Sequence, residues 1–500
     1  MSLDYLADGI AAVVQPDSLL VILVGVLVGT VTGVLPGLGA VGAMAVLMPF
    51  SIALDPAQGI LLLAGVYLGA QYGGSTTSVL MRVPGEASSV VTAIDGYEMT
   101  KRGRGGAALA IAALASFVAG TLSVLALMLI GPQLADIAVR FSAPEFLVLG
   151  VVALLVLSRV SGERFALAMV SVGIGLGLAA IGLDPESGQT RLTFGISDAN
   201  VGIEITSVAV GLFGLAEVFL VLERRRASTP PPGIPMRELL PTRTELGRST
   251  APMFRGGLIG FLTGLIPGPS AVLATYASYS LERKVSRHRG EFGRGAVEGV
   301  AGPEAANNGA TGAAMIPLLV LGIPFAAPTA ILLGALTLND VTPGPLLIAD
   351  EPVLFWTIIA GLYAANVMLL VLNLPLVGLF TLLLRVPRDI LLTAILVVTL
   401  VGTYAVRNSI FDVAVLVVMG ALGYVMVKCG LPRAPLILGF VLGGLIETSL
   451  VQTVALADGD VSYLLGRPIA MGILALGLVA LVAPALVRSG RTTEEKVDDS

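Results

Sequence analysis

The chain has 500 residues, of which 55% are hydrophobic, 13% are charged and 61 are glycine, with a formal net charge of −5. Soluble domains carry about 25% charged residues, so this composition excludes a soluble enzyme and a disordered chain, and the net acidity excludes a nucleic-acid-binding surface. A single cysteine, Cys429, and a single histidine, His288, rule out an intramolecular disulfide and leave no basis for a cysteine-rich or histidine-ligated metal site. We therefore expect a polytopic membrane protein.

Long apolar runs dominate the chain, as membrane-spanning helices require, whereas a β-barrel would show alternating segments of about ten residues. Residues 1–16 contain Asp4 and Asp8 but no basic residue, so they predict a short interfacial helix rather than a cleavable signal peptide. The runs that predict spanning helices are 18–35, 56–74, 105–131, 144–158, 165–182, 203–222, 353–384, 390–405, 410–427, 434–453 and 466–487.

A polar stretch divides these runs into two groups. It contains ERRR at 223–226 and TPPPGIP at 229–235, and charge with proline stiffness is typical of a linker. The sequence therefore predicts four parts: a first transmembrane repeat over 1–222, a cytoplasmic linker over 223–250, a second transmembrane repeat over 251–487 and a polar C-terminal tail over 488–500.

The two halves resemble each other in sequence. GTVTGVLPGLGAV at 29–41 aligns without a gap with GFLTGLIPGPSAV at 260–272. After a gap, YGGSTTSVL at 72–80 aligns with NGATGAAMI at 308–316, and VPGEASSVVTAI at 83–94 aligns with IPFAAPTAILLG at 323–334. We therefore predict two copies of one structural unit.

Loop charges predict how the copies are oriented, because Lys and Arg near span ends favour the cytoplasm. The linker and residues 101–104 and 283–294 are basic and are placed inside, whereas 1–17 and 339–351 carry acidic but no basic residues and are placed outside. The halves then have opposite orientations. We predict an all-α polytopic membrane protein of roughly 11–13 spanning or re-entrant helices in two inverted-topology repeats, with the N-terminus outside and the C-terminus inside.

Glycine and proline interrupt one apolar run of each copy at matching positions, in GVLPGLG at 33–39 and GLIPGPS at 264–270. Such breaks free backbone groups, which is tolerated only within protein or beside a water-filled cavity. Half-helix N-termini then favour an anion. The predicted substrate-binding residues of the breaks are Pro36, Gly37, Gly39, Pro267, Gly268 and Ser270. The alternative is that these residues only pack or kink the helices.

Short polar side chains accompany the second match. Hydroxyl and amide groups can bind a carboxylate or ligate Na⁺. We predict that Ser75, Thr76, Thr77, Asn307, Asn308 and Thr311 contribute to substrate binding, and that Asn308, Thr311 and Glu304 bind the coupling ion. The alternative is that these side chains join neighbouring helices.

Four ionisable residues need separate interpretation. Arg82 lies four residues before Glu86, so the two could form a charge pair, or Arg82 could contact an anionic substrate. Glu447 lies in an apolar run and is a candidate proton or cation site. Asp95, with its polar neighbours at 98–102, is predicted to belong to a solvated interface.

Three stretches resemble the large membrane subunit of the tripartite tricarboxylate transporters, the TctA family: GVLPGLGAVGAMAVLMPF, YGGSTTSVLMRVPGEASSVVTAIDGYEMTKRGRGG and GVAGPEAANNGATGAAMIPLLVLGIPFAAPTAILLGAL. The resemblance covers nearly the whole chain. It implies a multi-pass protein of the cell membrane that takes up a small carboxylate delivered by an extracytoplasmic solute-binding protein. It also implies a small membrane subunit as partner and coupling to a Na⁺ or H⁺ gradient. The family often carries Asn at the position of Arg82, so the choice of carboxylate stays open.

Other functions remain as alternatives. The chain lacks the phosphate-binding motif GxxxxGK[ST], so energy must come from a gradient or from another chain. A binding-protein-independent transporter of another small anion would need the same features. A channel would need selectivity elements repeated around an axis, and a membrane enzyme would need a catalytic constellation. We predict a transporter with no catalytic residues, no metal site and no cofactor.

Overall fold

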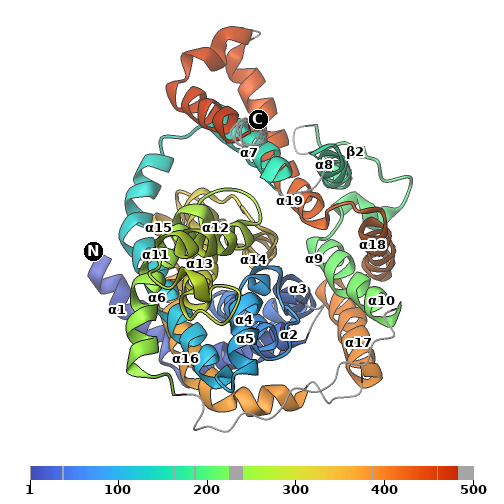
Figure 1. Ribbon diagram of the computed structural model, residues 1–500. Helices are drawn as coiled ribbons and strands as arrows, with labels where there is room; N and C mark the ends of the chain where they lie inside the picture. The colour runs from blue at the N-terminus through green and yellow to red at the C-terminus, as the bar shows by residue number, and fades with distance from the viewer. Residues whose placement is uncertain are drawn as a thin grey trace, which may run out of the picture. The chain divides into compact units, whose positions relative to one another are not determined.

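The computed structural model describes residues 2–35, 39–160, 165–184, 187–223, 240–383, 388–458 and 460–481. Over these ranges the chain consists of helices, their connections and one two-stranded hairpin (Figure 1). Each predicted apolar run is helical over most of its described length. The all-α membrane class is therefore confirmed.

The α-helices are α1 (Ser2–Val13), α2 (Pro16–Val34), α3 (Gly39–Ser51), α4 (Pro56–Met81), α5 (Thr92–Lys101), α6 (Gly105–Ala138), α7 (Ala143–Val160), α8 (Phe165–Ala179), α9 (Ile205–Ala209), α10 (Ala216–Glu223), α11 (Arg243–Gly264), α12 (Ser270–Val285), α13 (Glu298–Ala313), α14 (Ala327–Leu338), α15 (Leu347–Asp350), α16 (Pro352–Leu383), α17 (Arg388–Arg407), α18 (Ile410–Cys429) and α19 (Arg433–Ala457). A further helix covers Pro468–Leu481. The 3₁₀ turns are η1 (Ala87–Val90), η2 (Ser197–Val201), η5 (Arg289–Glu291) and η7 (Val461–Gly466), and the π-helical turns are η3 (Val210–Leu215) and η6 (Pro317–Leu321). Strands β1 (Gly182–Leu183) and β2 (Thr190–Arg191) pair antiparallel.

Six helical segments in the described part of the chain are long and apolar enough to cross a membrane: Pro16–Val34, Gly105–Ala138, Ile205–Glu223, Pro352–Asn373, Ile410–Cys429 and Arg433–Ala457. Shorter apolar helices include Gly39–Ser51 and Ala327–Leu338. The chain is therefore a multi-pass membrane protein. The exact number of spans and their orientation stay predictions.

Packing divides the chain into two units, Met1–Asp136 with Glu204–Val425, and Ile137–Ile203 with Met426–Ser500. The predicted boundary at 223–250 is not the boundary between these units. Residues 224–239 of the predicted linker lie outside the described residues, whereas its end, from Arg243 onwards, forms the first turns of α11. The predicted tail at 488–500 also lies outside the described residues.

In the first unit, glycines of α2 pack directly against the backbone of α4. A Cβ added at Gly29 would overlap the carbonyl oxygen of Val66, and Gly25 and Gly33 approach α4 in the same way. Such close contact is typical of membrane helices, where small residues let two backbones approach. It fixes α2 and α4 as a rigid pair.

Helices α11 and α13 form a second pair with the same contacts. A Cβ at Gly260 would overlap the carbonyl oxygen of Ala306, and Gly256 and Gly264 meet α13 at four-residue intervals on either side. The partner helices also contribute a glycine each. Gly69 of α4 packs against the backbone of α2, and Gly309 of α13 packs against the backbone of α11. The two helix pairs therefore share one pattern of glycine contacts, as two copies of one unit would.

This correspondence corrects one predicted alignment. Gly29 corresponds to Gly260, 231 positions later, as predicted, whereas Val66 corresponds to Ala306, 240 positions later. The predicted match of 72–80 with 308–316 spans 236 positions and is therefore one helical turn out of register. Small residues recur every four positions along this interface, so a shift of one turn preserves the sequence pattern and misleads an alignment.

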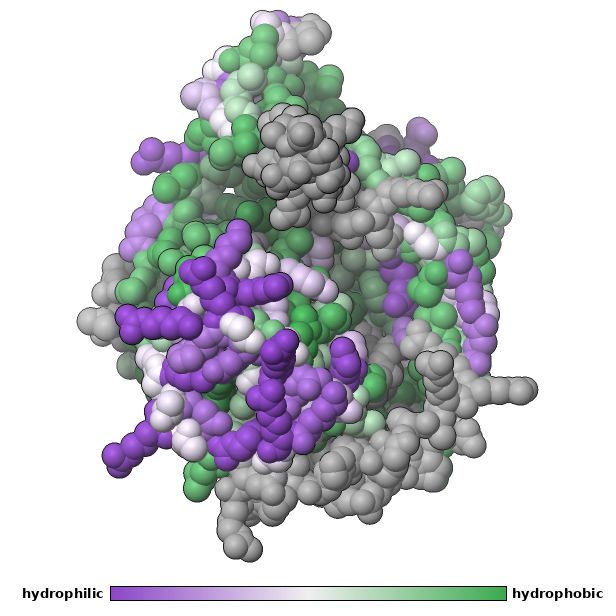
Figure 2. Space-filling view, viewed as in Figure 1, coloured by the Kyte–Doolittle hydropathy of each residue, from purple (hydrophilic) through white to green (hydrophobic). Residues whose placement is uncertain are grey.

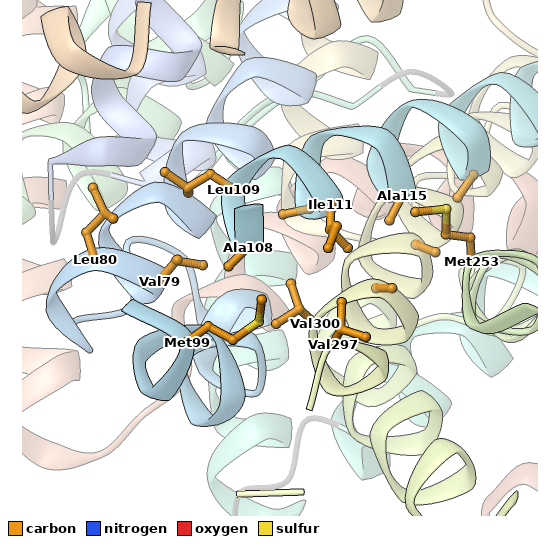
Figure 3. Close-up of a cluster of buried hydrophobic side chains, with 14 residues drawn as sticks. Val79, Leu80, Met99, Ala108, Leu109, Ile111, Ala115, Met253, Val297 and Val300 are labelled. Carbon is orange, nitrogen blue, oxygen red and sulfur yellow. The ribbon is translucent and has the colours of Figure 1, made fainter. Parts of the chain in front are cut away.

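A cluster of buried apolar side chains lies where α6 crosses α4, α5 and α13 (Figure 3). The alanine-rich face of α6 is surrounded by Val79 and Leu80 of α4, Met99 of α5, Val300 of α13 and Val297, the N-cap residue of α13. All are nearly inaccessible to solvent. Because α6 is small on this face, the two helix pairs can both pack closely against it.

Three polar segments of the first unit meet one another. Arg104 forms an ion pair with Glu245 at the start of α11, and the N–H groups of Gly295 and Ala296 donate to Asp95 over 2.8 and 2.9 Å. Figure 2 shows hydrophilic side chains gathered over this part of the molecule, which in Figure 1 holds α5, α11 and α12. The basic segments 101–104 and 283–294 therefore lie on the same side of this unit as the start of α11. Asp95 itself is fully buried, so the prediction of a solvated interface is wrong for this residue.

The second unit contains α7, α8, α19 and the hairpin of β1 and β2. Gly175 of α8 packs against the backbone of Leu436 in α19. From the hairpin, Arg191 donates two hydrogen bonds to the carboxylate of Glu447, over 2.5 and 2.6 Å. Glu447 thus anchors the hairpin on α19, which gives it a structural role in place of the predicted proton or cation site.

Candidate functional site

The break in the second repeat is present. Helix α11 ends at Gly264 and α12 begins at Ser270, so residues 265–269, which include Pro267, are not helical. Gly268 has a φ of 139°, which L residues rarely adopt, and its N–H donates to the carbonyl of Phe325 over 2.9 Å. The break is therefore held against the segment that follows α13 and η6.

The corresponding break of the first repeat is described only at its edges. Helix α2 ends at Val34, and α3 begins at Gly39, which has a φ of 61°. The predicted residues Pro36 and Gly37 lie outside the described residues. The structure therefore places Gly39 but makes no statement about the middle of this break.

The segments after α4 and after η6 have the same backbone design. Arg82 and Gly322, 240 positions apart, each end a helical turn in the left-handed conformation, with φ of 57° and 70°. Glu86 and Ala326, again 240 positions apart, each precede the next helical turn. The hydroxyl of Ser89 bonds to the main chain of Glu86, and the hydroxyl of Thr329 bonds to the main chain of Ala326 in the same way. The predicted register of 83–94 with 323–334 agrees with this geometry.

One side chain distinguishes the two copies. The Glu86 carboxylate accepts a hydrogen bond from the N–H of Ala40, in the first turn of α3. A helix N-terminus carries partial positive charge, so a carboxylate is stabilised there. In the second copy the position of Glu86 holds Ala326, and the first turn of α12, from Ser270, receives no side-chain cap. The two breaks thus differ by one carboxylate.

The structure does not bring Arg82 and Glu86 together. Their predicted charge pair is missing from the ion pairs formed by the described residues, and Glu86 bonds to the N-terminus of α3 instead. Arg82 has a left-handed backbone conformation at the end of α4, where it is exposed. Helical spacing suggested the pair, but the helix ends between the two residues.

A buried carboxylate lies where the two copies and α6 meet. Glu304 of α13 is 1% exposed. It accepts hydrogen bonds from the hydroxyls of Ser75 in α4 (2.7 Å), Thr92 in α5 (2.5 Å) and Ser116 in α6 (3.4 Å). Asn308 lies one turn further along α13, and its amide donates to Ser116 over 2.7 Å. We call these five residues the Glu304 cluster.

Three members of the Glu304 cluster, Ser75, Ser116 and Glu304, line a small cavity of about 20 Å³. Its lining consists of Tyr72, Ser75, Thr76, Leu109, Ala112, Ala113, Ser116, Glu304 and Asn373. A site for one water requires at least about 10–15 Å³ by this measure, whereas pockets for small organic ligands span roughly 300–1,000 Å³. The cavity therefore has room for one water or one ion and none for an organic acid.

The other predicted polar residues occupy the same region. Thr76 lines the cavity, and Thr77 bonds back to the carbonyl of Gly74. Thr311 donates to the carbonyl of Asn307, whose own side-chain nitrogen and oxygen are buried without a hydrogen-bond partner. A buried amide left unpaired costs about 1–3 kcal/mol. Among the described residues, both polar atoms of the Asn307 side chain thus lack a hydrogen-bond partner, so this residue stays a candidate for ligand binding.

Comparison with known proteins identifies the family. The model of the tripartite tricarboxylate transporter TctA family matches residues 19–438. This chain belongs to the TctA family. An uncharacterized 52.8 kDa protein of Agrobacterium vitis, from the TAR-I ttuC' 3' region, is 43% identical over 493 residues, which is 98% of each chain. A second uncharacterized protein of that organism, from the TAR-II ttuC' 3' region, is 45% identical over 238 residues, 48% of this chain and 98% of its own. No solved structure matches.

Sequence reasoning missed two members of the site of this TctA protein. Ser116 lies in the apolar run LASFVAG, and Thr92 precedes the polar stretch that was interpreted as solvated. Both are fully buried and bond to Glu304. The signal in the sequence was a single hydroxyl in an apolar run, which is more often a helix-packing residue. Only the contact with Glu304 shows that these two hydroxyls belong to the site.

Proposed function

We propose that this TctA-family protein takes up a small carboxylate across the cell membrane by secondary active symport, as the large membrane subunit of a three-part system. The observation that carries this proposal is the difference between the breaks. In the first copy the protein places its own carboxylate, Glu86, on the N-terminus of α3. In the second copy Ala326 leaves the N-terminus of α12 available to a carboxylate from outside.

In this proposal the substrate carboxylate binds at the second break. The N–H groups at Ser270 and beyond supply hydrogen-bond donors, and charge-assisted bonds of this kind are about twice as strong as neutral ones. Asn307, with its unpaired amide, would add a further donor and acceptor. The inverted orientation of the two copies would place both breaks near the middle of the membrane, as in other secondary transporters.

The proposal includes partners and an energy source. A family of tripartite transporters implies an extracytoplasmic solute-binding protein that delivers the substrate and a small membrane subunit. Na⁺ or H⁺ entering down its gradient would drive uptake. We expect the lipid bilayer to contact the apolar outer faces of the helices, and we expect no nucleic-acid partner.

Uptake of radiolabelled mono-, di- and tricarboxylates into proteoliposomes tests this proposal. The protein is reconstituted with its small subunit, with and without the solute-binding protein. We expect uptake of one carboxylate class that requires the binding protein. Uptake that proceeds equally without it would instead indicate an independent transporter, and uptake of no carboxylate would refute the proposal.

The site is tested by Gly268→Val with Gly173→Val as matched control. A β-branched residue at a φ of 139° is strained by about 1–3 kcal/mol. Gly173 lies in α8, where an added Cβ meets open space and φ is not positive. We expect the first variant to insert but to lose uptake, and the second to keep it. Normal uptake by an inserted Gly268→Val protein would mean that the break is only structural.

A further inference from the structure

We propose that the Glu304 cluster binds one dehydrated sodium ion, at a place separate from the carboxylate substrate. This inference deepens the proposed function, because it assigns the coupling ion to named residues. It rests on the composition of the cluster, the size of its cavity and the helices from which its ligands come.

The ligand set suits a monovalent cation. It combines one carboxylate, from Glu304, with the hydroxyl oxygens of Ser75 and Ser116, which line the cavity. Thr92 bonds to the other oxygen of this carboxylate and holds it in place. Oxygen ligands suit hard cations, and one carboxylate neutralises one positive charge. A divalent ion would favour several acidic ligands, and the described residues contain no group of three or more His, Cys, Asp or Glu. The charge balance therefore favours Na⁺.

The cavity matches a single ion. Its volume of about 20 Å³ leaves room beside the Glu304 carboxylate for one dehydrated ion, and a proton would need no such space. Tyr72 and Asn373 supply further polar groups on its wall. Leu109 and Ala112 form both part of this wall and part of the apolar cluster in Figure 3. This apolar side excludes water, which strengthens the attraction between ion and carboxylate.

The origin of the ligands explains how binding could be coupled to transport. Ser75 and Thr92 come from α4 and α5 of the first copy, Ser116 from α6, and Glu304 from α13 of the second copy. An ion bound to Ser75, Ser116 and Glu304 would hold the two copies together on α6. With the ion absent, the carboxylate is held only by hydrogen bonds, so the ion would favour one arrangement of the copies over another.

The internal repeat predicts one such ion. In the register fixed by the helix packing, Glu304 corresponds to Ala64 in α4, 240 positions earlier. The first copy therefore has no carboxylate at this position. The carboxylate of the cluster comes from the second copy alone, so the repeat does not double the site.

Binding of ²²Na⁺ to the purified full-length protein tests the inference, with no carboxylate and no binding protein present. We expect saturable binding of one ion per chain, which choline and K⁺ do not displace. Glu304→Gln should abolish saturable binding. Ser75→Ala and Ser116→Ala should each weaken it by about two- to twelve-fold, the equivalent of one hydrogen bond. Ser158→Ala is the matched control, because its buried hydroxyl bonds only to the carbonyl of Leu154 in its own helix.

The outcomes separate this inference from the proposed function. Sodium binding that depends on Glu304 and the two serines supports the inference even if no carboxylate is taken up. Absence of saturable binding in the wild type overturns it, as does unchanged binding in Glu304→Gln. Uptake driven by a pH gradient in Na⁺-free buffer, and lost in Glu304→Gln, would show that the cluster carries a proton and would also overturn it. The serine variants keep the test decisive if Glu304→Gln does not fold.

Discussion

Replacing Asn307 by alanine should make the protein more stable and less active. The side chain of Asn307 is fully buried, and neither its nitrogen nor its oxygen has a hydrogen-bond partner. Removing an unpaired buried amide recovers about 1–3 kcal/mol, and alanine is the better helix former by up to about 0.7 kcal/mol. Against this, roughly 30 Å³ of vacated space would cost about 0.7 kcal/mol at ~24 cal/mol per Å³. The net gain should be about 1–3 kcal/mol.

The melting temperature of the purified protein without substrate measures this effect, and proteoliposome uptake measures the loss of function. We expect a higher melting temperature together with an apparent KM for the carboxylate raised at least about two- to twelve-fold, as for one lost hydrogen bond. Asn308→Ala is the matched control. Its amide is bonded to Ser116, so this variant should be less stable. A less stable Asn307→Ala protein, or one with normal uptake, would refute the assignment of Asn307 to the substrate.

Two further predictions concern charged residues outside the site. Glu447→Gln should lower the melting temperature, because it weakens the bidentate bond from Arg191, and should leave the sodium dependence of uptake unchanged; a changed dependence would restore Glu447 as an ion site. Burial raises the pKa of Glu298, but hydrogen bonds from Arg248 outweigh burial and leave the pKa below its ordinary value. A lowered pKa contributes stability above the unfolded-state pKa of about 4.3, and this contribution is lost as pH falls through the folded-state pKa. The melting temperature should therefore drop below about pH 4, and a titration in which Arg248→Ala and wild type lose stability in parallel would contradict this.

Much of the fold followed from simple patterns in the sequence. Apolar runs predicted the helices because a membrane span must satisfy its own backbone groups and bury apolar side chains. Gly29 and Gly260, which aligned in the predicted repeat, both face the backbone of a neighbouring helix, where only glycine fits. The register of α4 against α13 did not follow, since their small residues recur with the period of one helical turn. Only the packing shows that Val66 is the residue of α4 equivalent to Ala306 of α13, because each contacts the aligned glycine of its own copy.

The site was predicted in part, for reasons that lie in long-range contacts. Ser75, Glu304 and Asn308 were predicted from the polar stretches in which they lie, and the structure places them in one cluster. The hydroxyls of Thr92 and Ser116 were missed, since each is isolated in sequence and acquires its meaning from a carboxylate about 190–210 positions away. Spacing alone also misassigned Glu86, which bonds to a helix end 46 positions earlier rather than to the nearby arginine.

Accumulation of a labelled carboxylate against its own gradient tests the central claim most directly. Proteoliposomes that contain this protein and its small subunit are given the loaded solute-binding protein outside and an inward Na⁺ gradient. We predict an internal carboxylate concentration above the external one, which collapses when the Na⁺ gradient is dissipated. Equilibration to equal concentrations, with or without the gradient, would instead indicate a channel and would contradict the account.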